Sequence, residues 1–357
     1  FFDKLPNSVR VTRPETIGTP GRQNSIYAEN IGPTLSALSH SPVLPAAGEA
    51  VTVSVRAEDP DEVQAVRLHY SVDDGRFNSV AMMPSSTHEY MAIIPGQSNG
   101  DVVQFYVQAE DSRGSNSVFP AEGAASRALY QVPSQNARSG IHNFRIIMTP
   151  DDTSLLHNRT NVVSNGHLGA TVVYNESEVF YDVGVRLRGS NAGRSDASYL
   201  GFQVAFDPMH RFRGVHNSVV IDRSGRSSPT PRTQDEIIIK HIANAAGDIP
   251  HMYDDLVHVI APRRSHTRSA LLLMARYGND FLDSQYENGS DGTVYKLDIA
   301  YIANGTLGGN PENAKIPSPY SHPSPTRDLE DLGDDKEAYR SHLMIRNNRD
   351  ADDYETI

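Results

Sequence analysis

Residues Phe180–Arg226 read FYDVGVRLRGSNAGRSDASYLGFQVAFDPMHRFRGVHNSVVIDRSGR. Apolar residues alternate with polar ones in Tyr181–Arg188 and again in Tyr199–Phe206, and this period of two predicts two strands. Arg186 and Arg188 lie on the opposite face of the first strand from its valines. The segment therefore predicts a pair of strands, the first of which carries two arginines on its polar face.

The loop that joins these two strands is rich in Gly, Ser and Asn. Gly189 and Gly193 can adopt positive φ without the steric penalty of a Cβ atom. Strand, basic pair, Gly-rich loop and strand form a plausible phosphate-facing arrangement. An ordinary hairpin with an arginine-rich polar face has the same sequence, so both interpretations remain open.

Bulk composition restricts the class of protein. The 357 residues suffice for two or three domains, and 22 Pro and 26 Gly favour strands and turns. The net charge of −12 argues against nucleic acid as a partner, and the absence of Cys excludes disulfides and thiolate metal sites. No apolar run approaches the roughly 18 residues of a membrane helix. The chain starts without Met, and we expect a fragment of a longer polypeptide, truncated at both ends.

Residues 31–133 carry the pattern of an antiparallel β-sandwich. Short alternating segments such as Ala50–Ala57 and Val102–Ala109 are separated by turn signals such as Asp59-Pro60-Asp61. They resemble fibronectin type III or Ig-like modules of bacterial surface proteins. Residues 1–30 predict one strand and a linker, and Thr19–Asn24 resembles the closing segment of a lamin-tail-type domain.

Acidic and imidazole side chains are candidate metal ligands. Asp59, Asp61 and Glu62 could donate oxygens to Ca²⁺, or they could form an Asp-Pro turn; both interpretations stay open. The 14 His residues contain no H-E-x-x-H motif, which favours loop and surface positions for them. The histidines therefore give no recognised metal-binding motif.

Residues 141–357 mix strands with helices. Thr233–Ala246 predicts a helix with Thr233 and Glu236 as a capping box and with Ile238 and Ile242 in an apolar stripe. Further expectations cover paired strands, a helix, a short strand, an irregular loop and two C-terminal helices. The paired strands are expected at 256–261 and 269–274, the helix at 279–286 and the short strand at 293–297. The irregular loop is expected at 299–327, and the two C-terminal helices at 334–347 and from Asp352 or Asp353.

The order of these segments resembles the spore-coat-H-type (CotH) kinase family. The resemblance rests on VGVRLRGS (183–190), YLGFQVAFDP (199–208) with FRG, SVVIDRS (218–224), QDEIIIKHIANAAGDIP (234–250), LLLMARYGNDFLDSQYENGSDGTVYKLD (271–298) and DDKEAYRSHLMIRNNRDADDYETI (334–357). It implies that an all-β Ig-like sandwich is followed by an α+β atypical protein-kinase-like domain, 141–357, represented by its N-terminal lobe and incomplete at the C-terminus.

The resemblance also implies a reaction and a site. A CotH-type kinase transfers the γ-phosphoryl group of ATP to Ser/Thr of a protein with Mg²⁺ or Mn²⁺, and such a site needs cations on the phosphates. No catalytic residue and no metal ligand is assigned. The expected nucleotide-binding residues are Arg186, Arg188, Gly189, Glu236, Lys240 and Lys296.

Two departures from the family pattern favour an alternative. The strand Tyr199–Phe206 has no lysine, where family members often carry lysines, and Ala275-Arg276 stand where members often have a Glu. The alternative is a non-catalytic adhesion or scaffold protein with a degenerate kinase-like domain. In either case the resemblance implies an exported bacterial protein, extracellular, at the cell surface or periplasmic, with an unknown protein partner.

Overall fold

The computed structural model describes most of the chain in two compact units. Unit 1 comprises residues 1–137, 145–153 and 166–182, and unit 2 comprises 138–144, 154–165 and 183–357. The expected strand and the lamin-tail resemblance of residues 1–26 lie outside the described residues, apart from Gly21. The described residues are 21, 27–162, 164–189, 194, 198–223, 233–247, 249–297, 303–306, 315–317, 331, 333–340 and 343–355.

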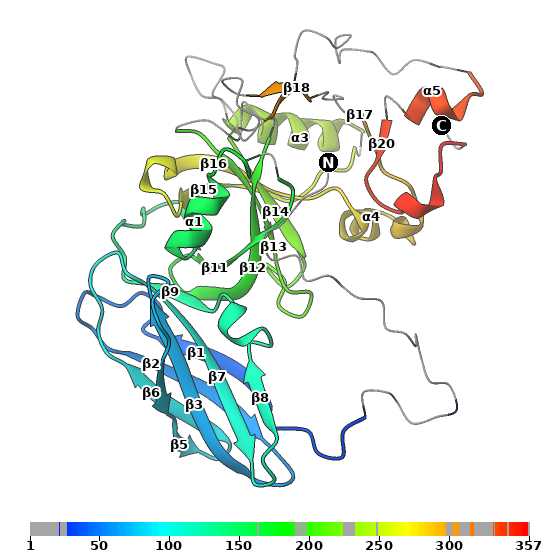
Figure 1. Ribbon diagram of the computed structural model, residues 1–357. Helices are drawn as coiled ribbons and strands as arrows, with labels where there is room; N and C mark the ends of the chain where they lie inside the picture. The colour runs from blue at the N-terminus through cyan, green and yellow to red at the C-terminus, as the bar shows by residue number, and fades with distance from the viewer. Residues whose placement is uncertain are drawn as a thin grey trace. The chain divides into compact units, whose positions relative to one another are not determined.

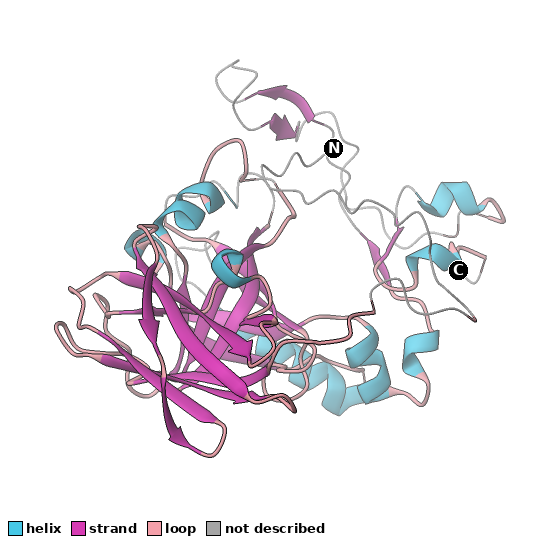
Figure 2. Cartoon of the chain, turned by 60° about the horizontal axis from the view of Figure 1, so that its bottom comes forward, coloured by secondary structure: helices cyan, strands magenta, loops and turns pink. Residues whose placement is uncertain are grey.

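Unit 1 contains the expected antiparallel sandwich (Figure 1). One sheet has the strand order β1-β2-β6-β5, and the other has the order β4-β3-β7-β8 with β9 also paired to β7. Strands dominate the cartoon coloured by secondary structure (Figure 2). The bounds are β1 Thr34–Ser41, β2 Val51–Glu58, β3 Val63–Val72, β4 Asn78–Ala81, β5 Met83–Ser86, β6 Glu89–Ile94, β7 Val102–Asp111, β8 Asn116–Phe119 and β9 Leu129–Gln131.

The period-two pattern of the strands produces the core of this sandwich. Along β2, Val51, Val53 and Val55 are buried while the residues between them are not. They pack with buried residues of the facing sheet, Leu68 and Phe105 among them. Each fully buried Val or Leu side chain contributes roughly 1.5–3 kcal/mol of hydrophobic stabilisation, so the alternation is sufficient to specify which face of each sheet is buried.

The acidic turn after β2 is held by its own side chains. The Asp59 carboxylate accepts a hydrogen bond from the Asp61 backbone N–H at 2.7 Å, and Asp61 pairs with Arg113 at 3.2 Å. These are the contacts of an Asx turn closed by an ion pair. The turn interpretation therefore accounts for these acids.

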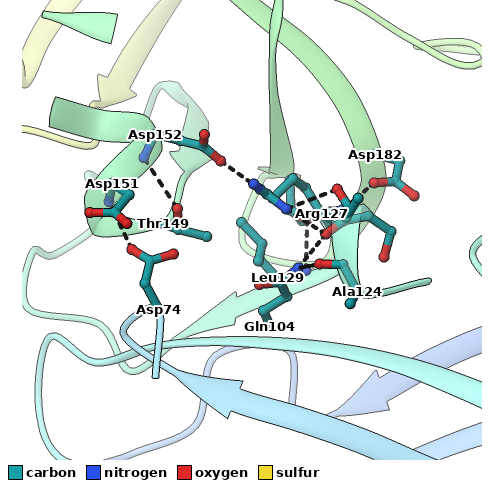
Figure 3. A network of polar contacts seen from close by, with 12 residues as sticks. Asp74, Gln104, Ala124, Arg127, Leu129, Thr149, Asp151, Asp152 and Asp182 are labelled. Atoms are coloured by element: carbon teal, nitrogen blue, oxygen red, sulfur yellow. Dashed lines mark hydrogen bonds and ion pairs between the residues drawn. The ribbon is translucent and has the colours of Figure 1, made fainter. Parts of the chain in front are cut away.

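A polar network in unit 1 surrounds Arg127 (Figure 3). The Arg127 Nε donates to Asp152 Oδ2 at 2.5 Å, and its backbone N–H donates to Asp182. Thr171 Oγ1 donates to the Arg127 carbonyl at 2.6 Å and accepts from the Leu129 backbone N–H at 2.9 Å. The charge of Arg127 is thus balanced by a carboxylate, and its backbone groups are paired.

Arg145 is a second neutralised arginine of unit 1. Its side chain is 1% exposed, and its Nη2 and Nε donate to the two carboxylate oxygens of Glu176 at 2.7 and 3.3 Å. Nη2 also donates to the Gln135 carbonyl at 3.1 Å. A bidentate carboxylate is the geometry that best compensates a buried guanidinium.

Seven strands form a closed barrel in the order β10-β11-β12-β13-β14-β16-β15. The expected strand pairs of the opening segment and of residues 256–274 are confirmed, because β12 pairs with β13 and β15 with β16, both antiparallel. The bounds are β10 His142–Ile147, β11 Leu168–Tyr174, β12 Glu178–Arg188, β13 Gly201–Ala205, β14 Ser218–Asp222, β15 Asp254–Ile260 and β16 Arg268–Ala275, and α1 is Pro150–Leu156.

The helix expected at 233–246 is present as α3, Thr233–Gly247, but its apolar stripe was assigned to the wrong face. Ile238 and Ile242 are 52% and 60% exposed, whereas Ile237 packs with Leu272 and Met274. Three consecutive isoleucines, 237–239, allow more than one stripe, and contact with β16 selects the one containing Ile237. The Thr233 side chain of the expected capping box lies outside the described residues.

Other expectations for unit 2 were wrong in detail. The helix expected over 334–347 ends at Arg340 and is followed by a strand, which pairs with the Tyr-Lys strand. Asp352 does not start a helix; it pairs with Arg340. Part of the loop expected over 299–327 forms a two-stranded sheet. The bounds are α4 Asn279–Gln285, β17 Tyr295–Leu297, β18 Ala303–Thr306, β19 Lys315–Pro317, α5 Lys336–Arg340 and β20 Leu343–Ile345.

Candidate functional site: an arginine cluster in unit 2

The polar face of β12 is the starting point of the candidate site. Val183, Val185 and Leu187 are buried, and Arg186 and Arg188 alternate with them and are half-buried. The expected division of this strand into an apolar and a basic face is therefore confirmed. Gly189, the first residue after the strand, has φ +105°, a conformation that L side chains rarely adopt.

Arg188 reaches across the neighbouring strand to a carboxylate. It is in register with Gly201 of β13, and its Nη1 forms an ion pair with Asp222 at the end of β14. A Cβ built on Gly201 would lie 2.9 Å from the Ile221 carbonyl oxygen and 3.4 Å from the Arg188 Cβ. Glycine is therefore required where the arginine crosses the middle strand.

Arg186 and Arg194 converge on one amide oxygen. Arg186 Nη1 and Arg194 Nη2 both donate to Asn165 Oδ1, at 3.1 and 2.8 Å. Arg186 also donates to Gln203, and Arg194 donates to the Gly189 carbonyl at 2.8 Å. These acceptors satisfy N–H groups but carry no net charge, so neither guanidinium is paired with a carboxylate of the described residues.

Three more arginines come from segments far along the chain. Arg276 directly follows β16, whereas Arg346 and Arg349 follow β20. Asn347, between the latter two, donates to the Asn279 side chain at 3.0 Å, only three residues beyond Arg276. This hydrogen bond ties the two segments together.

The electrostatic environment shows that these side chains act on one another. Burial lowers the pKa of Arg186 to about 10, and four other arginines, 194, 276, 346 and 188, lower it as smaller causes. Burial also lowers the pKa of Arg276, followed by the charges of Arg346, Arg349 and Arg188. Both Arg186 and Arg276 remain protonated near neutral pH. We call this set the arginine cluster: Arg186, Arg188, Arg194, Arg276, Arg346 and Arg349.

Five of the six arginines have no carboxylate partner among the described residues. Arg188 pairs with Asp222, whereas no ion pair with a described carboxylate involves the other five. Two unit charges about 4 Å apart interact with about 1 kcal/mol in water and about 4 kcal/mol at the effective dielectric of a protein surface. A set of like charges in a chain of net charge −12 is thus a local exception to the charge balance, and a bound anion would relieve it.

Lys240 and Glu236, two of the expected nucleotide-binding residues, lie together on α3. Lys240 Nζ is 3.0 Å from Glu236 Oε1, one helical turn away, and 3.7 Å from the buried Asp254. It also lies 3.2 Å from the Met274 sulfur. Lys240 is already paired with two carboxylates, unlike five arginines of the cluster.

Lys296 lies on β17 with its side chain exposed, in register with Met344 of β20. Arg346 is two residues beyond that register position. The structure thus places Arg186, Arg188 and Gly189 at the end of β12. It places Lys296 on β17, which pairs with β20, the strand that directly precedes Arg346.

The expected cofactor, ATP with Mg²⁺ or Mn²⁺, fits the donor set only in part. Guanidiniums match phosphate oxygens, with which they form bidentate charge-assisted hydrogen bonds. In the part of the chain that the structure describes, no group of three or more His, Asp or Glu side chains is placed to hold a metal ion. The arginines therefore fit the phosphates, and the described residues do not fit the metal.

Four residues of the cluster were missed by sequence reasoning: Arg194, Arg276, Arg346 and Arg349. Arg276 had been noted only as a departure from the family pattern. Arg346 stood in a segment expected to be helical, Arg349 between two expected helices, and Arg194 in a loop. The one sequence feature that could have indicated these residues is an excess of arginines over acidic residues at strand ends. Only the tertiary structure shows that these strand ends lie close together.

Comparisons with known proteins do not identify the chain. No family model matches it, and no curated protein does. A solved structure titled as a Br derivative of BhCBM56 is 18% identical over 26% of this chain and 88% of its own, with a TM-score of 0.19. A cycloalternan-forming enzyme from Listeria monocytogenes in complex with a pentasaccharide substrate is 14% identical over 56% of this chain, with a TM-score of 0.22. The match spans 17% of that enzyme. These TM-scores are too low to support any inference on fold or function.

Among the described residues, no helix is both long and apolar enough to cross a membrane.

Proposed function

We propose that unit 2 is a CotH-type kinase-like domain whose arginine cluster binds the phosphates of ATP for transfer to Ser/Thr of a protein. The single observation that supports the proposal is that five arginines of the cluster have no carboxylate partner among the described residues. Phosphoryl transfer depends mainly on positioning the phosphates and neutralising their charge. Arginine forks supply both functions.

In this proposal each residue has a defined part. Arg186 and Arg194, oriented by the shared Asn165, hold one end of the phosphate chain. Arg276 and Arg346 neutralise the charge that moves toward the leaving oxygen. The divalent metal expected for the family would supply further charge neutralisation, but the described residues provide no ligand set for it, and no step is assigned to it. The protein is exported in this proposal, with the sandwich of unit 1 as a spacer or adhesion module.

The second candidate is a non-catalytic surface scaffold with a degenerate kinase-like domain. The exposed isoleucines of α3 favour it, because Ile238, Ile239 and Ile242 are 52%, 64% and 60% exposed. Exposed apolar side chains clustered on one helix are typical of interaction surfaces.

Two measurements on the same protein separate the candidates. ATP binding is followed by thermal shift with and without Mg²⁺ or Mn²⁺, and phosphoryl transfer is followed with γ-labelled ATP and a Ser/Thr-containing protein acceptor. At 100-fold its Kd, a ligand stabilises the native state by about 2.7 kcal/mol. Binding with transfer supports the kinase. Binding without transfer supports the scaffold with a retained phosphate site, and no binding removes the nucleotide from the proposal.

A further inference from the structure

The arginine cluster carries more positive charge than a single phosphate group would neutralise. Five of its arginines are uncompensated by any described carboxylate. One terminal phosphate carries a charge of about −1.5 to −2 near neutral pH, whereas a chain of three linked phosphates carries about twice that. The charge of the cluster therefore matches a condensed phosphate chain better than a monophosphate.

The cluster is also extended. Arg186 and Arg194 share Asn165 at one end, and Asn347 links the segment of Arg346 and Arg349 to that of Arg276 at the other. The charge of Arg194 lowers the pKa of Arg186, and that of Arg349 lowers the pKa of Arg276. The charge of Arg346 lowers both pKa values. The charges from both ends thus act on Arg186, because Arg194 and Arg276 both lower its pKa.

The acid content of the cluster bears on how phosphates would be held. Mg²⁺ is bound in proteins by one or two carboxylates together with phosphate oxygens. Asp222, the carboxylate paired within the cluster, is already occupied by Arg188. The donors available to a phosphate chain here are therefore guanidinium N–H groups, which bind phosphate oxygens directly.

We infer that the arginine cluster binds a condensed chain of at least three phosphates directly, without a bridging divalent cation. This inference rests on the phosphate site of the proposed function and names its ligand chemistry. A nucleoside triphosphate and an inorganic polyphosphate share that chemistry. The ligand is selected by the length and charge of its phosphate chain.

Isothermal titration calorimetry of the whole chain tests the inference. AMP, ADP, ATP and inorganic tripolyphosphate are titrated in EDTA and again with excess Mg²⁺. We expect affinity to rise at least tenfold from ADP to ATP, and tripolyphosphate to bind in EDTA within about threefold of ATP. Mg²⁺ should weaken binding, because it neutralises the chain that the arginines recognise. If ATP binds much more tightly than tripolyphosphate does, the ligand is a nucleoside triphosphate and not an inorganic polyphosphate.

Matched variants show whether the cluster itself is the site. Arg276→Gln and Arg346→Gln should each weaken tripolyphosphate at least tenfold, whereas Arg211→Gln, which removes the same charge on the 207–214 turn, should not. Near-UV circular dichroism checks that each variant is folded. Two variants are used so that the test still holds if one of them does not fold.

Several outcomes would overturn the inference. It falls if binding requires Mg²⁺, if AMP binds as tightly as ATP, or if a short single-stranded oligonucleotide binds as tightly as tripolyphosphate. Metal-dependent ATP binding with phosphoryl transfer would leave the proposed kinase function standing. Metal-free tripolyphosphate binding without transfer would support the inference and remove catalysis. No binding of any phosphate removes both.

Discussion

The arginines of the two units differ in charge balance although their hydrogen bonds are similar. In unit 1, Arg145 and Arg127 each face a carboxylate, Glu176 and Asp152, and also donate to backbone carbonyls. In unit 2, the described acceptors of Arg186 and Arg194 are amide and carbonyl oxygens. Both arrangements satisfy donors, but among the described residues the first one alone neutralises the charge of its arginines.

This difference separates a structural role from a binding role. A guanidinium paired with a carboxylate stabilises the fold, and loss of the partner is destabilising. A guanidinium without one contributes repulsion to the folded state and attraction to an anion. The predictions below test that distinction, from the largest expected effect to the smallest.

Removing a structural partner should be the most damaging change. Glu176→Gln keeps the shape of the side chain but leaves the Arg145 guanidinium, 1% exposed, without a counter-charge. Breaking a buried pair in this way costs about 3–5 kcal/mol. Urea denaturation measures the loss of unfolding free energy, and Glu178→Gln, at an exposed position, is the matched control. A loss below about 1 kcal/mol would show that Arg145 does not depend on its carboxylate.

Acid should destabilise unit 1 through a buried histidine. Burial lowers the pKa of His40 from 6.5 to about 4, and the ring contacts Tyr181 and stacks on Tyr130. The unfolded chain binds a proton below pH 6.5 and the folded one does so only below about 4. Stability is therefore lost as the pH falls across this window, by about 3 kcal/mol.

Unfolding measured at pH 7 and at pH 4.5 checks this dependence. His40→Gln should reduce the difference between the two pH values, and His88→Asn, at an exposed position with positive φ, should not. An unchanged difference in His40→Gln would assign the acid sensitivity to other groups. The arginines of the cluster do not titrate in this range, so phosphate binding should not follow the same curve.

Removing an uncompensated arginine should affect binding and spare stability. Arg276→Gln removes repulsion from its neighbours, so the unfolding free energy should stay within about 0.5 kcal/mol of wild type. ATP affinity should fall about tenfold, equivalent to about 1.4 kcal/mol. Arg211→Gln is again the control. A variant that loses stability while keeping its affinity would place Arg276 with the structural arginines of unit 1.

Releasing the paired arginine of the cluster should have the smallest effect. Asp222→Asn frees Arg188, and we expect ATP affinity to rise about threefold while stability falls by about 0.5–1 kcal/mol, as for a partly exposed ion pair. Calorimetric titration and urea denaturation give the two values, and Glu287→Gln removes an exposed carboxylate elsewhere in unit 2 as the control. Equal gains in affinity in both variants would indicate a general charge effect instead.

Local patterns predicted the strands well because one face of each strand is buried. The alternation in β2 and β12 corresponds to buried and half-buried positions along both strands. The patterns failed where local propensity conflicts with tertiary contacts. Residues 343–345 were expected in a helix, but pairing with β17 makes them a strand. Ile238 and Ile242 were expected to be buried, but α3 packs through Ile237.

The site was predictable only in its local part. Arg186 and Arg188 were found because both are on one short strand next to a Gly-rich loop. Arg276 and Arg346 are 70 residues apart in the chain, and their proximity depends on contacts such as the hydrogen bond between Asn347 and Asn279. The pairing of Lys240 with Glu236 follows from their spacing on a helix, whereas the second partner, Asp254, comes from another strand.

Phosphorus-31 NMR of ATP titrated with the whole chain in EDTA tests the central claim most directly. If uncompensated arginines bind the phosphate chain, the three phosphorus resonances should shift and broaden with added protein, and the change should be lost in Arg186→Gln but kept in Arg211→Gln. Phosphorus resonances that stay unchanged at saturating protein, or that change equally with both variants, would contradict it.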